Sequence, residues 1–496
     1  MSAQPSRTAG PAISHIYTKI ADHRGKKRLW LEGRKLERAH FVPGTRFSLT
    51  WDPETSKVVI TPDEDGAHKV SRKERNGKEI PIIDVLGKQI DEMFGEGLAR
   101  AKVTVKKGQM TIEVHPDDAA TKERFDRLVD AVKSGRPITT GALAHGGGVI
   151  DHAIHAGLED LGIQARLQFA CEMDADTLDQ SARCNPIWSD DSILIEAPMQ
   201  EVDIEDFPKV DLLVAGLPCV GASRSGKSKN GITAAEEHPT AGALFIPFLR
   251  VVKHCNPSAI VLENVVEYAN EISAKVIRAT LETWGYTIYE TTFSGNEMGA
   301  LENRKRWAMI AVSNQFTVDL ERLLPVREKE KTLGEVLQDV DPDNAIWKDI
   351  SYLVAKNERD AAAKKGFSLN WVDANSEKVG TIGAGYAKNR STEPRIAHPT
   401  KENWSRLLTP EEHAAVKTIP PELVEGLSLT LAHKILGNSC IWTAFRSVGR
   451  LIGETVLSEV QEQQIDAIAE RQLTLFDLHD ELKQVEEAQH SVGMRR

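Results

Sequence analysis

The sequence predicts an α/β protein in which a Rossmann-like, doubly wound domain with a mostly parallel sheet follows a smaller β-rich domain. Three observations predict this fold class. Apolar runs of strand length recur in the middle of the chain, and helical patterns follow them. A glycine turn joins the first such strand to its helix. The first hundred or so residues instead contain two similar β-rich segments, and 496 residues are enough for two or three domains.

Residues 15–116 form the predicted N-terminal domain, whose main feature is a tandem repeat. Each copy is expected to hold a short strand, one helical turn and a β-hairpin. The copies align Gly33 with Gly87, Gly44 with Gly97, and Ile60 with Ile112. The pattern resembles the swapped-hairpin, AbrB-like DNA-binding fold, normally built from two chains, which two tandem copies would form within one. The alternative is a small β-domain that only packs or dimerises. Residues 1–14 are expected to be a disordered leader.

Residues 117–136 have helical periodicity up to Gly135 and are expected to form a connecting helix. The strand that follows, from Ile138, runs into the glycines of the turn, and residues 149–158 continue as a helix. Glycines there let the backbone approach a ligand closely, and the helix N-terminus favours a carboxylate or phosphate.

Three further apolar strands end on side chains that can carry chemistry. The strand before Pro218 leaves Cys219 at its carboxyl end, another closes on Glu263 and Asn264, and a third closes on Glu172. Parallel strands place their carboxyl ends at one edge of the sheet, which is where ligands bind in such folds. A cysteine at that edge, before a polar loop, is a candidate nucleophile. For a lone cysteine the alternative is a buried thiol, and for each glutamate a solvated strand end.

The residues at these positions, in this order, resemble the cytosine-C5 DNA methyltransferases. The matching segments are Pro218–Cys219 (the nucleophile loop), Glu263–Asn264–Val265 (the Glu-Asn-Val signature), Glu302–Arg306 (the Gln-x-Arg-x-Arg segment, with Glu302 in place of Gln), Arg406–Glu412 and Gly437–Asn438–Ser439. The resemblance implies an S-adenosylmethionine-dependent methyltransferase domain over residues 137–312 and 401–455. It implies a target-recognition region at 313–400, where no helical or strand pattern is strong enough to name a fold.

The resemblance also implies a reaction and the residues that perform it. Cys219 would attack C6 of a cytosine flipped out of the DNA stack, because C5 becomes nucleophilic only when this addition has broken the aromaticity of the ring. Glu263 would bind the N3 and amino edge as a protonated carboxyl, and Asn264 would position Pro218 and the base. Arg306 would hold the cytosine O2, with Arg304 supporting it. This chemistry requires no metal.

S-adenosylmethionine is the implied cofactor. The residues carried over to its site are Leu143, Gly147, Gly148, Glu172, Met173, Asn438 and Ser439, of which Glu172 would hold the ribose hydroxyls. This chain departs from the family pattern, because Leu143 replaces a Phe, His145 replaces the first Gly, and Met173 stands where an aromatic is common. The Asp expected at the adenine is absent, and Glu196 is the nearest acid.

Double-stranded DNA is the implied partner. Contacts are expected from the loop after Cys219, through Ser223, Arg224 and Lys227. A second set is expected from the glycine-rich part of the recognition region, through Gly383, Gly385, Lys388 and Arg390, where glycines permit close approach and cations meet phosphates. The implied setting is a restriction-modification enzyme that makes 5-methylcytosine in the cytoplasm of a bacterial or phage-infected cell, associated with the nucleoid.

Residues 456–496 form a predicted helical tail. Its segment Gln472-Leu473-Thr474-Leu475-Phe476 resembles the pentapeptide by which bacterial proteins dock on the replication sliding clamp, where an extended peptide would fill an apolar groove. The alternative is a set of apolar residues with which the helix packs on the catalytic domain.

Composition restricts the possible partners and the cellular compartment, but it does not decide the function. The formal net charge is −11, but basic clusters at 23–28, 34–35, 71–75 and 224–229 are separate from acidic segments at 196–206 and in the tail. The five cysteines lack the spacings of a disulfide framework or a zinc site, which indicates a reducing compartment. No apolar run reaches about 18 residues, so no signal peptide or membrane span is expected.

Two rival functions stay open at this point. The same catalytic set occurs in enzymes that methylate a tRNA cytosine, although the N-terminal domain and the recognition region favour DNA. The chain could also be a DNA-binding regulator with a degenerate methyltransferase half, for which the altered glycine loop and Val220 speak.

Overall fold

The computed structural model describes residues 13–52, 55–95, 98–218, 221–363, 368–390 and 392–493, and for residues 34, 38, 224, 225, 229, 467 and 469–493 it describes the backbone alone. The chain divides into two compact units, residues 1–123 and 124–496. Most of the expected leader lies outside the described residues. Its last two residues, however, begin the first strand, so the N-terminal unit starts at Ile13 rather than at residue 15.

The N-terminal unit consists of two antiparallel sheets and two short helices. One sheet has the order β1-β9-β10-β5-β4-β6 and the other β2-β3-β8-β7. The elements are β1 (Ile13–Lys19), β2 (Ala21–His23), β3 (Lys26–Glu32), α1 (Arg34–Arg38), β4 (Arg46–Asp52), β5 (Lys57–Pro62), β6 (His68–Lys69), β7 (Ser71–Arg75), β8 (Lys78–Leu86), α2 (Lys88–Met93), β9 (Arg100–Lys106) and β10 (Gln109–Val114). Alternate residues of β9 and β10 point into one apolar core.

Strand pairing in this unit follows the predicted repeat alignment. Equivalent strands of the two copies pair with each other in both sheets, β3 with β8 and β5 with β10. With Ile60 equivalent to Ile112, Val58 is equivalent to Met110, and the observed pairs are Ile60 with Met110 and Val58 with Ile112. Exchanging the two copies therefore converts each of these pairs into the other, as expected for a pairing with internal two-fold symmetry. Gly97, aligned with Gly44, lies outside the described residues.

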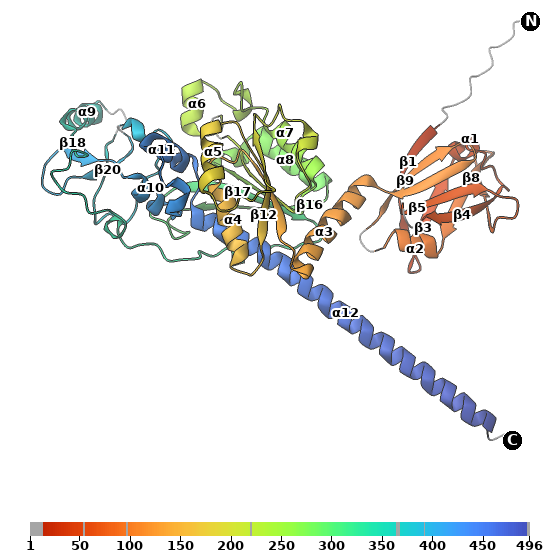
Figure 1. Ribbon diagram of the computed structural model, residues 1–496. Coiled ribbons are helices and arrows are strands. Elements are labelled where there is room, and N and C mark those ends of the chain that lie inside the picture. Colours follow the sequence, from red (N-terminus) through yellow and green to blue (C-terminus); the bar gives the residue numbers. More distant parts are fainter. Residues whose placement is uncertain are drawn as a thin grey trace, which may run out of the picture. The chain divides into compact units, whose positions relative to one another are not determined.

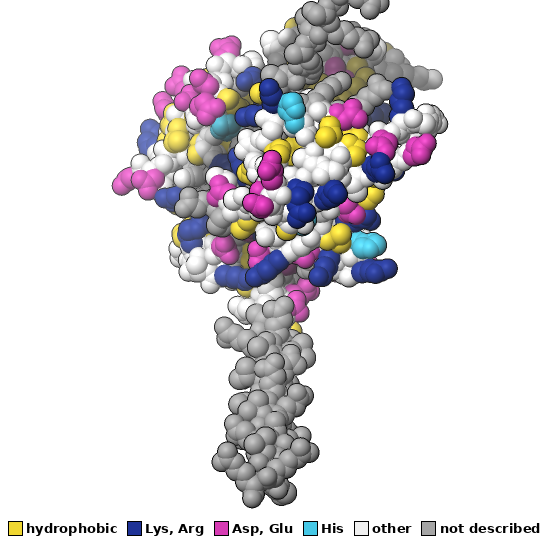
Figure 2. Space-filling view, turned by 90° about the vertical axis from the view of Figure 1, so that its right-hand side faces the viewer, with side chains coloured by type: hydrophobic (Ala, Val, Ile, Leu, Met, Phe, Trp, Pro, Cys, Tyr) yellow, Lys and Arg dark blue, Asp and Glu magenta, His cyan; other side chains and the backbone are white. Residues whose placement is uncertain are grey.

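The hairpins of the smaller sheet carry exposed basic side chains. Arg24 and Lys26 are exposed on the β2–β3 hairpin, and Arg72, Arg75 and Lys78 are exposed on β7–β8. Figure 2 shows Lys and Arg side chains along the lower border of one face of the molecule, with Asp and Glu among and above them. Positive charge is therefore gathered locally despite the negative total.

The C-terminal unit is built on a seven-stranded sheet of order β13-β12-β11-β14-β15-β17-β16 (Figure 1). The first five strands in this order are parallel, and β17 is antiparallel to both of its neighbours. The strands are β11 (Ile138–Leu143), β12 (Ala165–Glu172), β13 (Ile193–Glu196), β14 (Leu212–Gly216), β15 (Ala259–Asn264), β16 (Tyr286–Ser294) and β17 (Lys305–Ser313). This architecture confirms the predicted α/β class.

Helices cover both faces of this sheet because its strands are apolar on both sides. Leu212 and Val214 face a core shared with α3, α4, α11 and α12, whereas Leu213 and Ala215 face a core shared with α7 and α8. The helices are α3 (Pro116–Ser134), α4 (Val149–Glu159), α5 (Ala175–Cys184), α6 (Arg224–Asn230), α7 (Phe245–Cys255), α8 (Ile272–Thr283), α10 (Pro410–Val416), α11 (Leu429–Asn438) and α12 (Trp442–Gly493). None of the helices among the described residues is long and apolar enough to cross a membrane.

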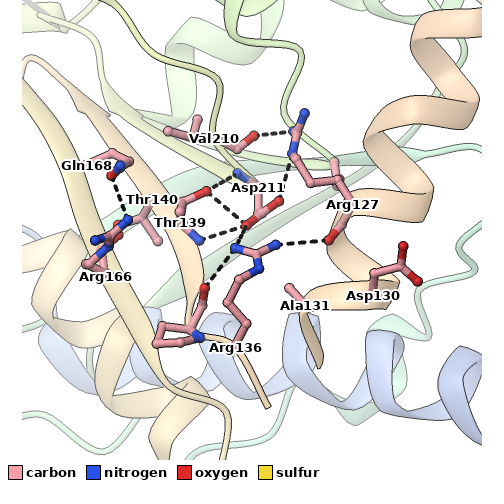
Figure 3. Close-up of polar contacts among 12 residues, drawn as sticks. Arg127, Asp130, Ala131, Arg136, Thr139, Thr140, Arg166, Gln168, Val210 and Asp211 are labelled. Carbon is pink, nitrogen blue, oxygen red and sulfur yellow. Dashed lines mark hydrogen bonds and ion pairs between the residues drawn. The ribbon is translucent and has the colours of Figure 1, made fainter. Parts of the chain in front are cut away.

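The expected connecting helix is α3, and its second half is bonded to the amino-terminal edge of the sheet (Figure 3). Arg127 Nε donates to Asp211 Oδ1 at 2.9 Å, and the other carboxylate oxygen accepts from the Thr139 backbone N–H at 2.8 Å. Arg124, 1 % exposed, donates to Ser313 Oγ and stacks on the Tyr286 ring. Residues from Arg124 onward in this helix therefore belong to the C-terminal unit.

Two elements extend across the predicted domain boundaries. The helix that contains the predicted tail, α12, begins at Trp442 rather than at residue 456, and Val456 and Val460 are buried in the core. The helix crosses α4 at close range, since a Cβ on Gly449 would lie 2.4 Å from the Ile154 carbonyl oxygen. The recognition region was ended at residue 400, but its four-stranded sheet includes a strand at 404–406.

That small sheet has the order β18-β21-β20-β19 and carries one helix. Its elements are β18 (Lys348–Asp349), α9 (Ser351–Ala362), β19 (Asn370–Val372), the 3-10 turn η6 (Tyr386–Lys388), β20 (Pro394–Ala397) and β21 (Trp404–Arg406). Strands of two to four residues are too short to show an alternating pattern, which is why the sequence predicted no fold here.

Candidate active site

The predicted site residues gather at the carboxyl edge of the parallel strands. β14 ends at Gly216, next to Glu263 on β15, with which it is in register. On the other side of β11, Glu172 at the end of β12 is in register with Glu196 on β13. Pro218 is exposed just beyond β14, and the predicted nucleophile Cys219 follows it outside the described residues. Chain order and strand direction thus bring these segments to one edge, as expected.

Glu263 and Arg306 face each other across the antiparallel pair β15–β17. Arg306 Nε lies 2.7 Å from Glu263 Oε1, and the two side chains are only 12 % and 14 % exposed. A partly desolvated pair of this kind is a strong, directional contact. The two side chains that the resemblance assigns to the cytosine therefore bond one another in this structure, within reach of the loop that begins at Pro218.

Asn264 connects the two central strand ends. Its side chain, on a residue that is 1 % exposed, donates from Nδ2 to the Leu217 carbonyl at 3.2 Å and accepts the Val265 backbone N–H at 2.8 Å. The first contact holds the backbone immediately before Pro218. Its geometry suits the expected positioning role.

The loop after residue 220 bends into α6. Ser223 is the N-cap of this helix, and its hydroxyl accepts the Gly226 N–H at 3.0 Å. Lys227, expected to contact DNA, instead donates to Glu271 at 2.6 Å in this structure. The side chain of Arg224 lies outside the described residues.

Glu172 organises the glycine turn at the expected cofactor site. Oε2 accepts the Gly146 N–H at 2.8 Å, and Oε1 accepts the N–H groups of Met173 and Asp174 at 2.8 and 3.0 Å. A carboxylate has about four acceptor positions, so one on Oε2 is left for a ribose hydroxyl. Holding both hydroxyls would require one backbone bond at Oε1 to give way.

Small residues are required in the turn. Gly148 has φ 72°, and a Cβ there would lie 2.5–2.6 Å from the side chains of Asn185 and His145. A Cβ on Gly147 would lie 2.6 Å from Ile435 of α11. Side chains of neighbouring elements therefore pack closely against these two glycines. The backbone of the turn lies at the carboxyl edge of the sheet, where a ligand could approach the start of α4.

His145, which replaces a family glycine, has a structural role that the sequence did not reveal. Its Nδ1 lies 2.9 Å from Asp151 Oδ2, and its Nε2 lies 2.7 Å from Ser181 Oγ. The buried ring thus joins the turn to the first turn of α4 and to α5. No spacing rule links these three positions, so sequence reasoning missed them.

The other residues carried over to the cofactor site differ in their exposure. Leu143 is buried at the end of β11, and Met173 is 68 % exposed. Asn438 is exposed at the last position of α11, and Ser439 follows it as the C-cap. The Leu143 side chain packs in the apolar core at this strand end.

In the recognition region, the glycines have internal partners. Gly383 donates its N–H to Glu393 at 3.1 Å, and a Cβ on Gly385 would lie 2.7 Å from the Arg390 guanidinium carbon. Burial raises the pKa of Glu393. Lys388 and Arg390 are exposed on the same loop. The cations are free to meet a polyanion, whereas the glycines also serve packing.

A fully buried ionic cluster lies behind Arg306, and its lysine was not predicted. Lys417 Nζ is 3.1 Å from Glu302 Oε2, and neither side chain is exposed. Burial and the positive charge of Arg304 lower the pKa of Lys417, while Glu302 opposes that shift. An apolar stretch around residue 417 gave no sign of a partner more than a hundred positions earlier in the chain.

Known proteins resemble this chain over the C-terminal unit. The family model of C-5 cytosine-specific DNA methylases matches residues 153–454, more than half of the chain. Type II methyltransferase M.SsoII of Shigella sonnei is 29 % identical over 271 residues, 53 % of this chain and 68 % of its own length. Type II methyltransferase M.NlaX of Neisseria lactamica is 28 % identical over 274 residues, 53 % of this chain and 82 % of its own length.

Solved structures agree on the fold. The crystal structure of S. pombe Dnmt2 methyltransferase superposes with a TM-score of 0.51 at 17 % identity, covering 65 % of this chain and 99 % of that one. The family match begins at residue 153, so the N-terminal unit lies outside it. The sheet, the order of the motifs and the extent of the match lead to one assignment. The chain belongs to the C-5 cytosine-specific DNA methylase family and is a DNA cytosine-5 methyltransferase that uses S-adenosylmethionine.

Proposed function

We propose that Cys219 is the nucleophile of this methyltransferase and that Glu263, Arg306 and Asn264 complete the catalytic site. The observation that carries the proposal is the Glu263–Arg306 contact of 2.7 Å beside the strand end from which the Cys219 loop departs. In the proposed reaction, the Cys219 thiolate adds to C6 of an extruded cytosine. After C5 has accepted a methyl group and lost its proton, the C6–sulfur bond breaks and the thiolate is released.

The paired side chains present complementary groups to a pyrimidine. The Arg306 guanidinium can only donate, so it suits the cytosine O2. A protonated Glu263 carboxyl can donate to N3 while its other oxygen accepts from the exocyclic amine. A cytosine bound to both side chains would replace the direct Glu263–Arg306 contact. In this structure, that contact holds the two side chains close to the positions from which they would bind the base.

Glu172 and the turn at 146–148 are the proposed cofactor-binding residues. Glu172 would accept a ribose hydroxyl, Met173 would cover the adenine, and the start of α4 would face the carboxylate. Glu196, in register with Glu172, is the acid nearest in sequence to the expected adenine-binding Asp. When bound there, S-adenosylmethionine supplies the methyl group. The fit rests on the backbone of the turn, where Cβ atoms are excluded.

The proposed DNA contacts are the exposed Lys388 and Arg390 of the recognition region and the loop that carries Ser223, Arg224 and Lys227. Lys227 would have to leave Glu271 to reach a phosphate. For the N-terminal unit we propose a second DNA contact, supported by its internal two-fold register and the basic hairpins of its smaller sheet. Because the substrate is DNA, the enzyme would act at the nucleoid.

The sliding-clamp motif stays a prediction. Gln472–Phe476 lie within the helical backbone of α12, and their side chains are outside the described residues. An extended peptide is the form that would enter an apolar groove, so docking would require this part of the helix to unwind.

Bisulfite sequencing of DNA from cells that express the wild type or Cys219→Ala tests the proposed reaction. We expect methylation at a fixed motif with the wild type and its complete loss in the variant. Equal methylation in both would refute Cys219 as the nucleophile. An unmodified genome with both would direct the same assay to RNA, and S-adenosylmethionine binding by the purified protein would then separate a tRNA methyltransferase from a regulator.

A further inference from the structure

Residues 301–304 join the start of β17 in the large sheet to the recognition region. Val379 donates its N–H to the Leu301 carbonyl, and Asn303 donates to the Val379 carbonyl, both at 2.8 Å. On its other side, Glu302 donates its N–H to the Val416 carbonyl at 2.9 Å. The chain then enters β17, which carries Arg306. Any shift of this junction is therefore passed directly to the residue that faces Glu263.

The Glu302 side chain contacts three segments at once. Oε1 accepts the Ile382 N–H of the recognition region at 2.7 Å, and Oε2 lies 3.1 Å from Lys417 Nζ. Arg304 Nη1 lies 3.8 Å from Oε1. All three charged side chains are at most 5 % exposed, so water does not screen them.

Arg304 is held elsewhere, although a carboxylate is close to it. Its Nη1 donates to the Ile382 carbonyl at 3.3 Å, and its Nη2 donates to the Gly437 carbonyl at 3.0 Å. Gly437 packs directly on the recognition loop, because a Cβ there would lie 2.2–2.4 Å from the backbone of residues 383 and 384. Arg304 thus connects the recognition loop, the end of α11 and the start of β17.

We propose that Lys417 is a positioning residue that neutralises Glu302 and thereby leaves Arg304 bonded to the Ile382 and Gly437 carbonyls. Without Lys417, the buried Glu302 carboxylate would have Arg304 as its nearest cation. Arg304 would move toward it and release one or both carbonyls. The recognition region would then lose its fixed position relative to Arg306. DNA held by the recognition region would no longer present the target cytosine to Arg306 in the correct position.

Neighbouring groups do not replace Lys417. His413 and His433 lie next to the cluster with their Nδ1 atoms 2.9 Å apart, and burial lowers the pKa of both, which keeps them neutral at physiological pH. Cys440 is buried close by, and burial raises its pKa, so it is neutral too. Lys417 is the cation that contacts Glu302 most closely among the described residues.

Three variants test the proposal, which rests on the proposed function. Lys417→Gln leaves the carboxylate without its main partner. Glu302→Gln keeps an oxygen for the Ile382 N–H and allows Lys417 to lose its proton. The double variant Glu302→Gln, Lys417→Gln replaces the ion pair with two amides of similar reach, which can bond one another. Asp211→Asn, which disturbs a buried ionic contact at the opposite edge of the sheet, is the matched control for simple destabilisation.

The measurement is kcat and KM for DNA, normalised to the folded fraction from thermal unfolding and S-adenosylmethionine titration. We expect kcat of Lys417→Gln to fall by ~100-fold, the effect of about 1 Å of misplacement at a reacting centre. Glu302→Gln should lose less, and the double variant should regain activity to within about tenfold of the wild type. Asp211→Asn should lose stability but keep its kcat.

The proposal is wrong if activity per folded molecule is unchanged in Lys417→Gln, or if the double variant is no more active than Lys417→Gln. It is equally wrong if Asp211→Asn lowers kcat as much as Lys417→Gln does. A failure of the proposed function would look different, because the wild type itself would then leave the DNA unmethylated.

Discussion

At each of the two edges of the catalytic sheet lies a buried carboxylate that accepts a backbone N–H and pairs with a cation. Asp211 at the amino edge accepts a backbone N–H from Thr139 at 2.8 Å and pairs with Arg127. Glu302, behind the carboxyl edge, accepts a backbone N–H from Ile382 at 2.7 Å and pairs with Lys417. Both carboxylate side chains are fully buried. The two contacts are therefore of the same kind, although Arg127 is 20 % exposed and Lys417 is fully buried.

What differs is the segment that each carboxylate connects. Asp211 joins α3 to the amino ends of β11 and β14, far along the strands from the ligand-binding edge. Glu302 joins the recognition region to the strand that carries Arg306. The same type of contact is thus expected to serve stability at one edge and alignment of the active site at the other.

The largest effect on the reaction rate should come from a substitution at the carboxyl edge of the sheet. Glu263→Gln removes the ionisable group beside Arg306, and a positioned acid or base contributes about 10²–10⁴-fold to rate. We expect the single-turnover rate constant for methylation, per folded molecule, to fall in that range. S-adenosylmethionine affinity is the control, and a variant with the wild-type rate constant would exclude Glu263 from catalysis.

Asp211→Asn should show the opposite behaviour. Breaking a buried pair by altering one partner costs about 3–5 kcal/mol, and here Arg127 would lose its carboxylate while Thr139 keeps an oxygen. Urea unfolding should therefore detect a lower free energy of unfolding, while kcat per folded molecule stays at the wild-type value. Loss of kcat without loss of stability would show that the two edges do not differ as described.

The smallest expected effect concerns His155, a half-buried residue on α4 whose Nε2 lies 2.8 Å from Thr140 Oγ1. Burial lowers the pKa of His155 to about 4 from 6.5, against the opposing charge of Asp151 and with His152 and His145 nearby. Between about pH 6.5 and 4 the unfolded chain binds a proton that the folded protein does not, so stability is full above this window and falls as pH falls through it.

The shift corresponds to about 2–3 kcal/mol over that window. His155→Gln keeps a polar partner for Thr140 but does not titrate. The stability difference between the wild type and this variant should therefore change by that amount between pH 7 and pH 4 in denaturant titrations. A difference that does not vary with pH would contradict the lowered pKa.

Much of the site was predictable because strand ends are local features. The apolar runs that end at Gly216, Asn264 and Glu172 are buried on both faces, and parallel strands must place their carboxyl ends together. The Glu263–Arg306 contact follows from that geometry once β17 lies beside β15. In the N-terminal unit, the alignment of Ile60 with Ile112 came from the sequence, whereas the pairing of β5 with β10 came from the structure.

Other features depended on contacts between distant parts of the chain. The start of α12 at Trp442 depends on its packing against α4, and the strands of the recognition region are held by their neighbours rather than by their own pattern. His145 looked like a departure from a glycine motif until Asp151 and Ser181 appeared around its ring. These partners come from different elements.

The sequence by itself determined the fold class, the family, the cofactor and the order of the catalytic segments, because each depends on short runs of residues and their spacing. Only the tertiary structure decided that Glu302 pairs with Lys417, that Arg304 is directed to the carbonyls of Ile382 and Gly437, and that Asp211 ties α3 to the sheet. A buried charge must find its counter-charge in space, and the energy of that pairing depends on distance and burial rather than on separation along the chain.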